Sequence, residues 1–396
     1  MIPLRIRAIT AISAMGAGME ATRAALNDRR GGLARCDLPD MPAGIWIGRV
    51  PGAEAAPIPP ALSSYACRNN RLAEMALGQD GFADAVAETA SRLGAARIAV
   101  VLGTSTAGIE ETEQAYRRRD ADGALPANYN FAHTHDLHAL PRYVRARLGL
   151  RGPAVSVSTA CTSGARSFLD AAMLIEAGCA DAAVVGGADT LCRLTLHGFS
   201  SLELLSRGPC RPCAADRDGI AIGEAAGFAL IERAQPGNGG EIALLGAGAS
   251  SDGHHMSSPH PDGLGAVLAM RDALAMARTA PAQVDYVNMH GTGTRANDAM
   301  EDRAIAQVFG DAVPCSSTKG WSGHALGASG ALEAAIAVIC IQHGLIPGCL
   351  GVDAPDPEFR SAIAVANRTA PVTHVMSNSF GFGGSNCALL FGRLPG

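Results

Sequence analysis

The sequence predicts an α/β fold made of two related halves, and two observations carry this prediction. Short apolar runs such as Arg97–Leu102 and Val284–Met289 alternate with helical stretches, which is typical of strands buried between layers of helices. The order of elements before the turn-rich patch Gln235–Gly240 is repeated after it. We therefore expect residues 1–238 and 239–396 to form two similar α/β units with a functional site between them.

Each element is placed by its own pattern. Strands are assigned to short runs of Val, Ile, Leu and Ala, and helices to longer stretches with apolar residues on one side, as Phe168, Ala172 and Ile175 are in Cys161–Ala177. The expected strands are Ile2–Thr10, Arg97–Leu102, Val155–Thr159, Ala180–Val185, Ile242–Ala247, Val284–Met289, His374–Ser377 and Cys387–Phe391. The expected helices are Met19–Asn27, Arg68–Leu93, Asp136–Leu148, Cys161–Ala177, Gly265–Arg278, Glu301–Phe309 and Ala325–His343.

The composition is that of a globular protein with a large core. The chain has 396 residues, a formal charge of −5, 48% hydrophobic residues and 17% charged residues, which argues against a disordered, fibrous or nucleic-acid-binding chain. Of its 32 basic residues, 31 are arginines and one is a lysine, Lys319. Compositional drift explains the arginines. A compact ammonium and a planar guanidinium are different reagents, so the single lysine marks a position to follow.

The chain is expected to be cytoplasmic, without a membrane span or a metal. Met1–Arg5 carries no signal-peptide pattern, and every long apolar run is interrupted by glycine, charged or polar residues. Eleven cysteines scattered through a large chain favour free thiols in a reducing compartment. Cys210 and Cys213 form an isolated Cys-x-x-Cys pair, which without a second pair is weak support for a metal or redox site.

A candidate nucleophile follows the expected strand Val155–Thr159. The chain runs through small residues to Cys161 and then into a helix. Unpaired N–H groups and the positive end of the dipole at a helix N-terminus favour a thiolate, the nucleophilic form of cysteine. A buried structural cysteine is the alternative interpretation.

Two histidines lie in loops of the second half. His290 follows an apolar strand in Val287–Thr294, where flanking glycines present it to a cleft, and Thr292 and Thr294 add hydroxyls for a polar ligand. His324 lies with Lys319 in the glycine-rich stretch Ser316–Gly330, which leads into a helix that carries Glu333. One such histidine is usually a satisfied polar residue, but two in similar positions favour a site.

A fourth block, Ser377–Asn386, is dense in glycine and lies between two late strands. Such a loop can turn a backbone N–H toward a developing oxyanion, and Phe380 and Phe382 within it can form a hydrophobic gate. A simple hairpin turn explains the glycines equally well.

Taken together and in this order, the four blocks resemble the β-ketoacyl-ACP synthases of fatty-acid and polyketide synthesis, in the thiolase superfamily. The matching segments are TACTSG, HGTGT-x-x-ND, STKGWSGHALGASG and NSFGFGGSN, joined by Gly186–Asp189, Asp216–Gly219 and Pro259–Gly263. The resemblance covers nearly the whole chain. It implies a five-layer αβαβα sandwich and a dimer, which can be a homodimer or a heterodimer with a ketosynthase-like partner.

The resemblance implies a role for each central residue. Cys161 is similar to the nucleophile that accepts an acyl group as a thioester. His290 and His324 resemble the pair that promotes malonyl decarboxylation and stabilises the enolate. Lys319 corresponds to the lysine beside that pair, and Glu333 to the acid that holds it. The reaction implied is a decarboxylative Claisen condensation with ping-pong kinetics.

The substrates implied are acyl and malonyl groups on the phosphopantetheine arm of an acyl carrier protein, with no tightly bound cofactor. The N–H groups of Cys161 and Phe382 would form an oxyanion hole, with the Phe382 side chain as gate. The further residues implied are Thr292 and Thr294 on the pantetheine arm, Thr106, Phe199 and Phe380 on the acyl group, and Asp298 and Glu301 as supports. Carrier proteins are acidic, so Arg117–Arg119 and the Arg142, Arg145 and Arg147 group are candidate docking patches, with solvated helix faces as the alternative.

Several residues depart from the family pattern, and one loop among them, that of Thr106, resembles its counterpart in a specialised pathway. Cys213 and Ala214 stand where Phe-Asp is frequent, and Arg295 stands where Pro is frequent. Thr106, at a position that gates chain length, is polar and followed by Glu110, as in ketosynthases of aryl-polyene-type clusters. A chain-length factor, the non-condensing partner of such enzymes, is the alternative, but Cys161 and both histidines argue against it.

Overall fold

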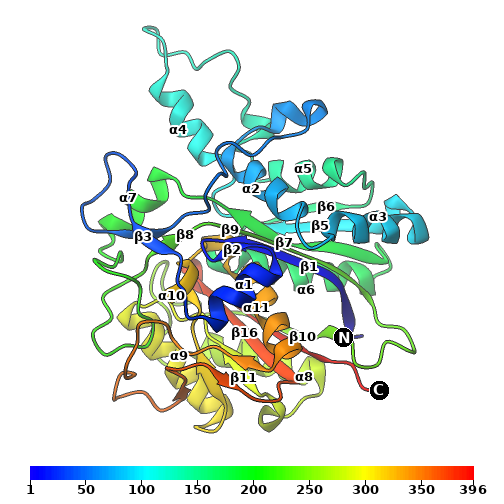
Figure 1. The fold of residues 1–396 in the computed structure, drawn as a ribbon, viewed down its shortest axis with the longest axis vertical. Helices are drawn as coiled ribbons and strands as arrows, with labels where there is room; N and C mark the ends of the chain where they lie inside the picture. Colours follow the sequence, from blue (N-terminus) through cyan, green and yellow to red (C-terminus); the bar gives the residue numbers. More distant parts are fainter.

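The computed structural model describes residues 1–396 and arranges them in five layers (Figure 1). The outer layers are helices, and two sheets enclose a central layer that contains α6 (Ser163–Glu176) and α11 (Ser329–His343). The α/β fold of two related halves is therefore confirmed.

The strands of each half follow the same scheme. In the first half β6, β5 and β7 run parallel, and β9 and β1 continue the sheet antiparallel. In the second half β12, β11 and β16 run parallel, and β17 and β10 follow antiparallel. Their bounds are β1 Leu4–Ser13, β5 Ile98–Gly103, β6 Ala154–Val157, β7 Ala182–Asp189, β9 Ala225–Arg233, β10 Ile242–Ser251, β11 Tyr286–Asn288, β12 Pro314–Ser316, β16 His374–Gly381 and β17 Ser385–Arg393.

The two sheets touch at one edge. Strands β1 and β10 pair through Leu4 with Leu244 and Arg5 with Ala243, so the strands form one continuous twelve-stranded sheet that includes β2 (Gly16–Ala17) and β14 (Ala362–Ile363). Two small sheets join β13 (Leu345–Ile346) to β15 (Arg368–Thr369), and β3 (Leu33–Arg35) to β4 (Trp46–Gly48) and β8 (Ile222–Gly223).

The remaining helices cover the outer faces or flank the site. Helices α2 and α5 contact the first half's strands, and α8 contacts β10, β17 and α9 in the second half. Their bounds are α1 Met19–Asn27, α2 Arg68–Leu77, α3 Phe82–Leu93, α4 Ile109–Arg117, α5 Ala139–Arg147, α7 Arg193–Ser201, α8 Leu264–Ala277, α9 Arg295–Phe309 and α10 Lys319–Ser322.

Helix α11 is buried along almost its whole length. The stretch Leu326–His343, which includes α11, has the length and mean hydropathy (1.4) of a membrane-spanning helix, yet 89% of it is buried inside the protein. Helix α11 contacts β9 and β1 on one side and β16 on the other, as a core helix does. Its apolar composition follows from contact with both sheets.

Several expected helices differ from the observed ones, among them α5, which starts at Ala139 and not at Asp136, and α11, which starts at Ser329 and not at Ala325. The stretch Arg68–Leu93 is two helices, because the chain breaks at Asp80 and Gly81, which both have positive φ. The helix expected from Cys161 begins with a 3-10 turn, and α6 itself starts at Ser163. The helix expected from Glu301 starts earlier, at Arg295, because Thr294 caps it by accepting a hydrogen bond from the N–H of Asn297.

Candidate active site

Cys161 lies where the chain turns from β6 into α6. Residues Ala160–Thr162 form one turn of 3-10 helix, and Ala160 is held at a positive φ of 52°. This sharp turn places Cys161 before the N-terminus of α6 with 7% of its surface exposed. Glycine allows α6 and the α11 region to approach here, since a Cβ on Gly164 would lie 2.7 Å from the carbonyl oxygen of Gly327.

Two histidines from the second half meet Cys161. Nε2 of His324 lies 3.1 Å from Sγ of Cys161, and Nδ1 of His324 lies 2.8 Å from Oγ of Ser329. The ring of His290 stands at 83° to that of His324, with 5.1 Å between the ring centroids. Cys161 and both histidines line one cavity. The structure thus brings together the three side chains that the sequence motifs indicated.

Lys319, the only lysine, is 1% exposed and contacts His290. Its Nζ donates to the carbonyl oxygen of His290 and to Oε1 of Glu333, each at 2.5 Å, and lies 3.4 Å from Nδ1 of His290. An ammonium group has donors only, so Nδ1 of His290 accepts and the ring proton resides on Nε2. Lys319 therefore fixes the tautomer in which His290 can donate a hydrogen bond from Nε2.

The resting charges of the site follow from its burial. Burial and the charge of Lys319 hold the pKa of His290 and of His324 well below the usual range. Burial raises the pKa of Cys161 to about 11, although Lys319 and the N–H of Phe382 act in the opposite direction. Burial thus acts against the thiolate that the helix N-terminus favours, and it also favours the neutral form of both imidazoles.

Two carboxylates on α9 shape the loop His290–Thr294. Glu301 accepts the N–H groups of the loop's first two residues at 2.8 and 2.7 Å. Asp298 accepts those of the next two at 2.9 and 3.2 Å. These hydrogen bonds hold the backbone of the loop from the side of α9. The hydroxyls of Thr292 and Thr294 lie 2.9 Å apart, and both residues line the cavity.

Aromatic rings form the apolar wall of the cavity. The N–H of Phe382, after β16, hydrogen-bonds to Cys161. The Phe382 ring packs against Phe199 of α7 with 5.6 Å between centroids, and Phe380 packs edge-on against His290 at 6.1 Å. All three phenylalanines line the cavity. The cavity therefore combines a nucleophile, two donors and an apolar wall.

The comparison with known families agrees with this geometry. Residues 69–236 match the family described as "Beta-ketoacyl synthase, N-terminal domain", and residues 242–353 match "Beta-ketoacyl synthase, C-terminal domain". The chain belongs to the β-ketoacyl synthase family. It is accordingly an acyl-transferring condensing enzyme of the 3-oxoacyl-[acyl-carrier-protein] synthase type, as its relatives are named.

Two relatives and one solved structure illustrate the similarity. The 3-oxoacyl-[acyl-carrier-protein] synthase 2 of Vibrio cholerae is 35% identical over 317 residues, 76% of this ketosynthase and 77% of the relative. The mitochondrial 3-oxoacyl-[acyl-carrier-protein] synthase of Arabidopsis thaliana is 41% identical over 271 residues, 64% of this chain and 59% of that relative, so less than two thirds of its length is spanned. A chain of the structure titled "Ketosynthase (ApeO) in Complex with its Chain Length Factor (ApeC) from Xenorhabdus doucetiae" has a TM-score of 0.91 and 38% identity, and the match covers 99% of this chain and 98% of that one.

One residue named from the sequence lies elsewhere in this ketosynthase. Thr106 is 1% exposed, does not line the cavity, and donates its hydroxyl to Asp189 at 2.8 Å. Ser329, the hydrogen-bond partner of His324, was not expected from the sequence as a site residue, although it lies inside the GHALGASG segment. Asp189 was not expected either, and its one sequence signal is its place shortly after two glycines at a strand end.

The donor set of the site would suit a soft metal ion by type alone. One ligand atom from each of Cys161, His290 and His324 lies within 4.8 Å of the others. However, the ammonium of Lys319 is close enough to repel a cation, and it occupies the Nδ1 position where a carboxylate usually orients a metal-bound histidine. The arrangement fits acyl transfer better than zinc binding. All eleven cysteines, including Cys210 and Cys213, are free.

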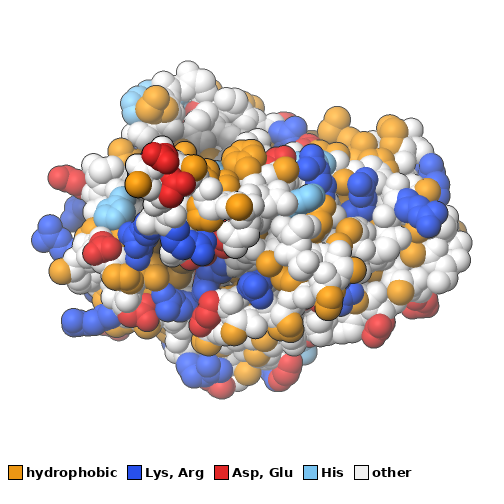
Figure 2. Space-filling view, turned by 90° about the horizontal axis from the view of Figure 1, so that it is seen from above, with side chains coloured by type: hydrophobic (Ala, Val, Ile, Leu, Met, Phe, Trp, Pro, Cys, Tyr) orange, Lys and Arg blue, Asp and Glu red, His pale blue; other side chains and the backbone are white.

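The basic patches expected from the sequence are largely neutralised. Arg117 pairs with Asp40, and Arg147 pairs with Glu74. Similar contacts join Arg118 to Glu111 and Arg142 to Asp136. Figure 2 shows basic side chains in separate groups among acidic and apolar ones on this face, and because Lys319 is buried they are arginines. A docking role for these arginines stays a prediction.

Proposed function

We propose that the protein is a β-ketoacyl-[acyl-carrier-protein] synthase that joins an acyl group on Cys161 to the two-carbon unit of malonyl-ACP. The observation that carries this proposal is the 3.1 Å contact between Cys161 and His324, with His290 beside them in one cavity. A nucleophile and two neutral imidazole donors are what decarboxylative condensation requires.

In the first step the thiol of Cys161 attacks the carbonyl carbon of an acyl-pantetheine thioester. The new S–C bond forms, the old one breaks, and the thiol proton passes through Nε2 of His324 to the departing pantetheine sulfur. The hydroxyl of Ser329 can donate to or accept from Nδ1, so it accommodates either tautomer of His324. The N–H groups of Cys161 and Phe382 stabilise the oxyanion, an effect of roughly 3 kcal/mol for each donor.

In the second step malonyl-pantetheine enters the emptied cavity. Its C–C bond to the carboxylate breaks, CO₂ leaves, and the electron pair forms an enolate whose oxygen accepts hydrogen bonds from Nε2 of His290 and His324. The enolate carbon then attacks the Cys161 thioester, the C–S bond breaks, and the Cys161 sulfur leaves as a thiolate that takes up one proton from solvent. Lys319, held by Glu333, keeps His290 in its donating tautomer. The products are β-ketoacyl-ACP and CO₂.

The cavity wall suggests how the substrate is held. Thr292 and Thr294 contact the pantetheine arm through their hydroxyls, Phe199 and Phe380 contact the acyl chain, and Phe382 acts as the gate. Asp298 and Glu301 support the loop that carries these threonines. No tightly bound cofactor is needed, since the carrier's phosphopantetheine arrives with the substrate.

The setting of the reaction completes the proposal. The protein acts in the cytoplasm with an acidic acyl carrier protein, and its two halves meet near residue 238. It pairs either with a second copy or with a ketosynthase-like subunit, as the ketosynthase of the Xenorhabdus structure is paired with its chain length factor. Chain elongation in a specialised pathway of aryl-polyene type is the setting that its departures from the family pattern favour.

Intact-protein mass spectrometry tests the function directly. The protein is incubated with a panel of acyl-ACPs and then with malonyl-ACP, and we expect an acyl adduct that forms and then disappears as β-ketoacyl-ACP accumulates. Cys161→Ala should give no adduct. Cys179→Ala is the matched control, because Cys179 is the exposed thiol of the chain and should be dispensable. An adduct that persists in Cys161→Ala would overturn the assignment, and no adduct with any acyl chain would indicate a non-condensing subunit.

A further inference from the structure

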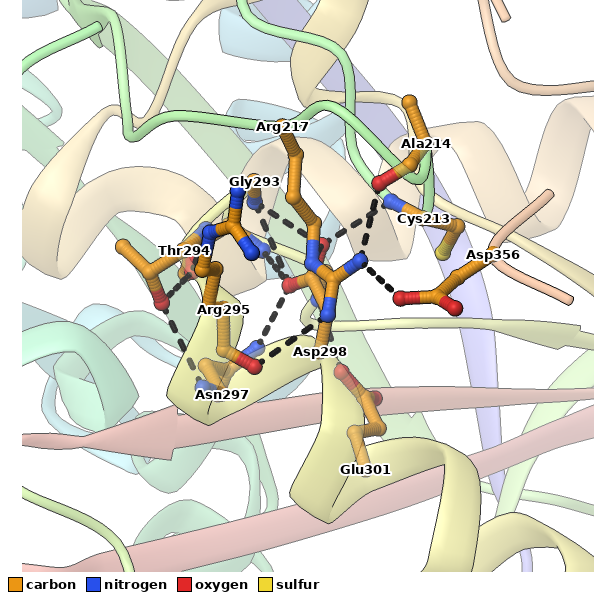
Figure 3. Close-up of polar contacts among 12 residues, drawn as sticks. Cys213, Ala214, Arg217, Gly293, Thr294, Arg295, Asn297, Asp298, Glu301 and Asp356 are labelled. Carbon is orange, nitrogen blue, oxygen red and sulfur yellow. Dashed lines mark hydrogen bonds and ion pairs between the residues drawn. The ribbon is translucent and has the colours of Figure 1, made fainter. Parts of the chain in front are cut away.

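Arg217 is a buried guanidinium that joins three separate segments of the chain (Figure 3). It is 4% exposed. Its Nη1 donates to the carbonyl oxygen of Ala214 at 2.8 Å and to Oδ2 of Asp356 at 2.7 Å, and its Nη2 donates to the carbonyl oxygen of Arg295 at 3.3 Å. The guanidinium carbon lies 4.8 Å from the centroid of the Phe359 ring. These contacts fix the guanidinium in one position at the start of α9.

The guanidinium also faces Asp298, which has no exposed surface. Nε of Arg217 lies 3.7 Å from Oδ2 of Asp298, and no other cationic side chain lies within 4 Å of this carboxylate. Figure 3 shows Arg217 between Asp298 and Asp356. Asp298 accepts four N–H groups, those of the backbone of Thr292, Gly293 and Cys213 and that of the Asn297 side chain.

Four donors require both oxygens of Asp298 to act as acceptors. A protonated carboxyl would turn part of that capacity into a donor and would release an amide of the His290–Thr294 loop. Burial raises the pKa of Asp298 and so favours protonation, whereas the charge of Arg217 opposes it. Arg217 therefore acts together with these N–H donors to favour the ionised form of Asp298, and Asp298 in turn holds the backbone of Thr292 and Gly293.

We propose that Arg217, anchored by Asp356, is a positioning residue that sets the Thr292 and Thr294 hydroxyls for the pantetheine arm. The inference rests on the proposed function only in assigning these hydroxyls to pantetheine. Arg217 lies outside the cavity and acts through Asp298, whereas Cys161, His324 and Lys319 are held by other contacts. Loss of Arg217 should therefore weaken binding of the arm more than it slows the chemistry.

The contribution of the arm to binding can be isolated by comparing two forms of the carrier protein. Dissociation constants are measured for apo-ACP, which lacks the arm, and holo-ACP, which carries it, and their ratio reports the arm alone. We expect this ratio to fall about tenfold in Arg217→Gln and about threefold in Asp356→Asn, as loss of one or two charge-assisted hydrogen bonds predicts. Asp356 is more exposed than Arg217, so we expect Asp356→Asn to disturb folding less than Arg217→Gln does.

Glu232→Gln is the matched control. Glu232 pairs with Arg5 on β9 and β1, its side chain is 7% exposed, and it does not line the cavity. We expect this variant to lose stability while keeping the apo-to-holo ratio. In steady-state assays, Arg217→Gln should raise KM for malonyl-ACP about tenfold with kcat within about twofold, and leave KM for malonyl ethyl thioester, which has no amide for the threonines, unchanged.

The positioning role of Arg217 and the proposed condensing function can fail independently of each other in these experiments. A wild-type protein that binds the arm but does not condense would contradict the proposed function and leave the ratio test intact. An unchanged ratio in both Arg217→Gln and Asp356→Asn would overturn the positioning role. So would a fall in kcat without a rise in KM, or an effect of Arg217→Gln that persists undiminished in a Thr292→Val and Thr294→Val background.

Discussion

Two loops at equivalent places in the two halves have opposite uses. The loop Gly103–Gly108 follows β5, the middle strand of the parallel trio in the first half, and His290–Thr294 follows β11, the middle strand of the trio in the second. Each is rich in threonine and glycine, and each is held by a fully buried carboxylate, Asp189 or Asp298.

The difference is where the carboxylate comes from. Asp189 ends β7, next to β5, and it accepts the hydroxyls of Thr104 and Thr106 as well as the N–H groups of Ser105 and Thr106. Asp298 lies on α9 and accepts only backbone N–H groups from its loop. The first loop therefore donates its hydroxyls to the carboxylate. In the second loop neither hydroxyl contacts Asp298, and both threonines line the cavity, although the hydroxyl of Thr294 also caps α9. We therefore expect similar sequence at equivalent strand ends to serve mainly stability in the first half and binding in the second.

The largest effect we expect tests the part that Lys319, in the second half, has in the chemistry. In Lys319→Arg the guanidinium must fit a fully buried space that now holds a smaller ammonium, so the contacts to His290 and Glu333 are displaced. Condensation should fall by roughly 10²- to 10³-fold, as for loss of a positioned donor, while the circular dichroism spectrum stays that of the wild type. Arg97→Lys, at an exposed ion pair with Asp181, is the control and should keep full activity. Full activity in Lys319→Arg would refute a specific ammonium role.

The next effect tests the structural use of the first loop. Asp189→Asn places an amide among four donors that need an acceptor, at a site with no exposed surface. We expect the free energy of unfolding in urea to fall by about 3 kcal/mol, the cost of breaking a buried charge network from one side. Asp181→Asn, on the same half but exposed, should change it by well under 1 kcal/mol. Equal losses in the two variants would contradict the structural role of Asp189.

Two matched Thr→Val substitutions, one in each loop, test the comparison directly. Thr106→Val removes a buried hydroxyl that donates to Asp189, and should lower the free energy of unfolding by about 1–2 kcal/mol with little change in KM. Thr292→Val removes a hydroxyl at the cavity wall, and should raise KM for malonyl-ACP several-fold with little change in stability. If Thr106→Val instead alters the chain length of the product, the gating role inferred from the family resemblance holds and the two loops are more alike than their contacts indicate.

Much of this site could be predicted because its residues are concentrated in short segments. The strand that ends before Cys161 and the glycines around His290 and His324 are local features that made these residues candidates, and the resemblance to the β-ketoacyl synthases gave them their expected roles. The single lysine stood out by composition alone. Its contacts with His290 and Glu333 suit a compact ammonium, and the Lys319→Arg variant tests whether one is required.

The parts that could not be predicted depend on contacts between distant residues. Asp189 lies 83 positions from Thr106, and Asp356 lies 139 positions from Arg217, so no local pattern reveals either pairing. The effect of burial on the pKa of Cys161 could not be predicted either, because the helix N-terminus is a local feature whereas burial depends on the packing of both halves. The break at Gly81 within Arg68–Leu93 was visible as a glycine, but the periodicity on both sides of it favoured one helix.

The smallest effect we expect concerns two buried glutamates, one in each half, whose contributions to stability depend on pH in opposite directions. Burial raises the pKa of Glu333 to about 7 despite its contact with Lys319, so its contribution to stability is present below about pH 4.5 and is lost as pH rises to about 7. Burial also acts to raise the pKa of Glu232, but Arg92 and Arg5 outweigh it and lower that pKa, so its contribution is present at neutral pH and is lost in acid.

Glu333→Gln should therefore flatten the decline in the free energy of unfolding between pH 5 and pH 8 (roughly the range above the ordinary glutamate pKa). Glu232→Gln should leave that range unchanged and flatten the loss below it. Urea denaturation at each pH measures both. If both variants shift the profile in the same direction, the two buried glutamates are not distinguished by their surroundings, and the contrast between an ion pair that serves stability and one that serves the site would not hold.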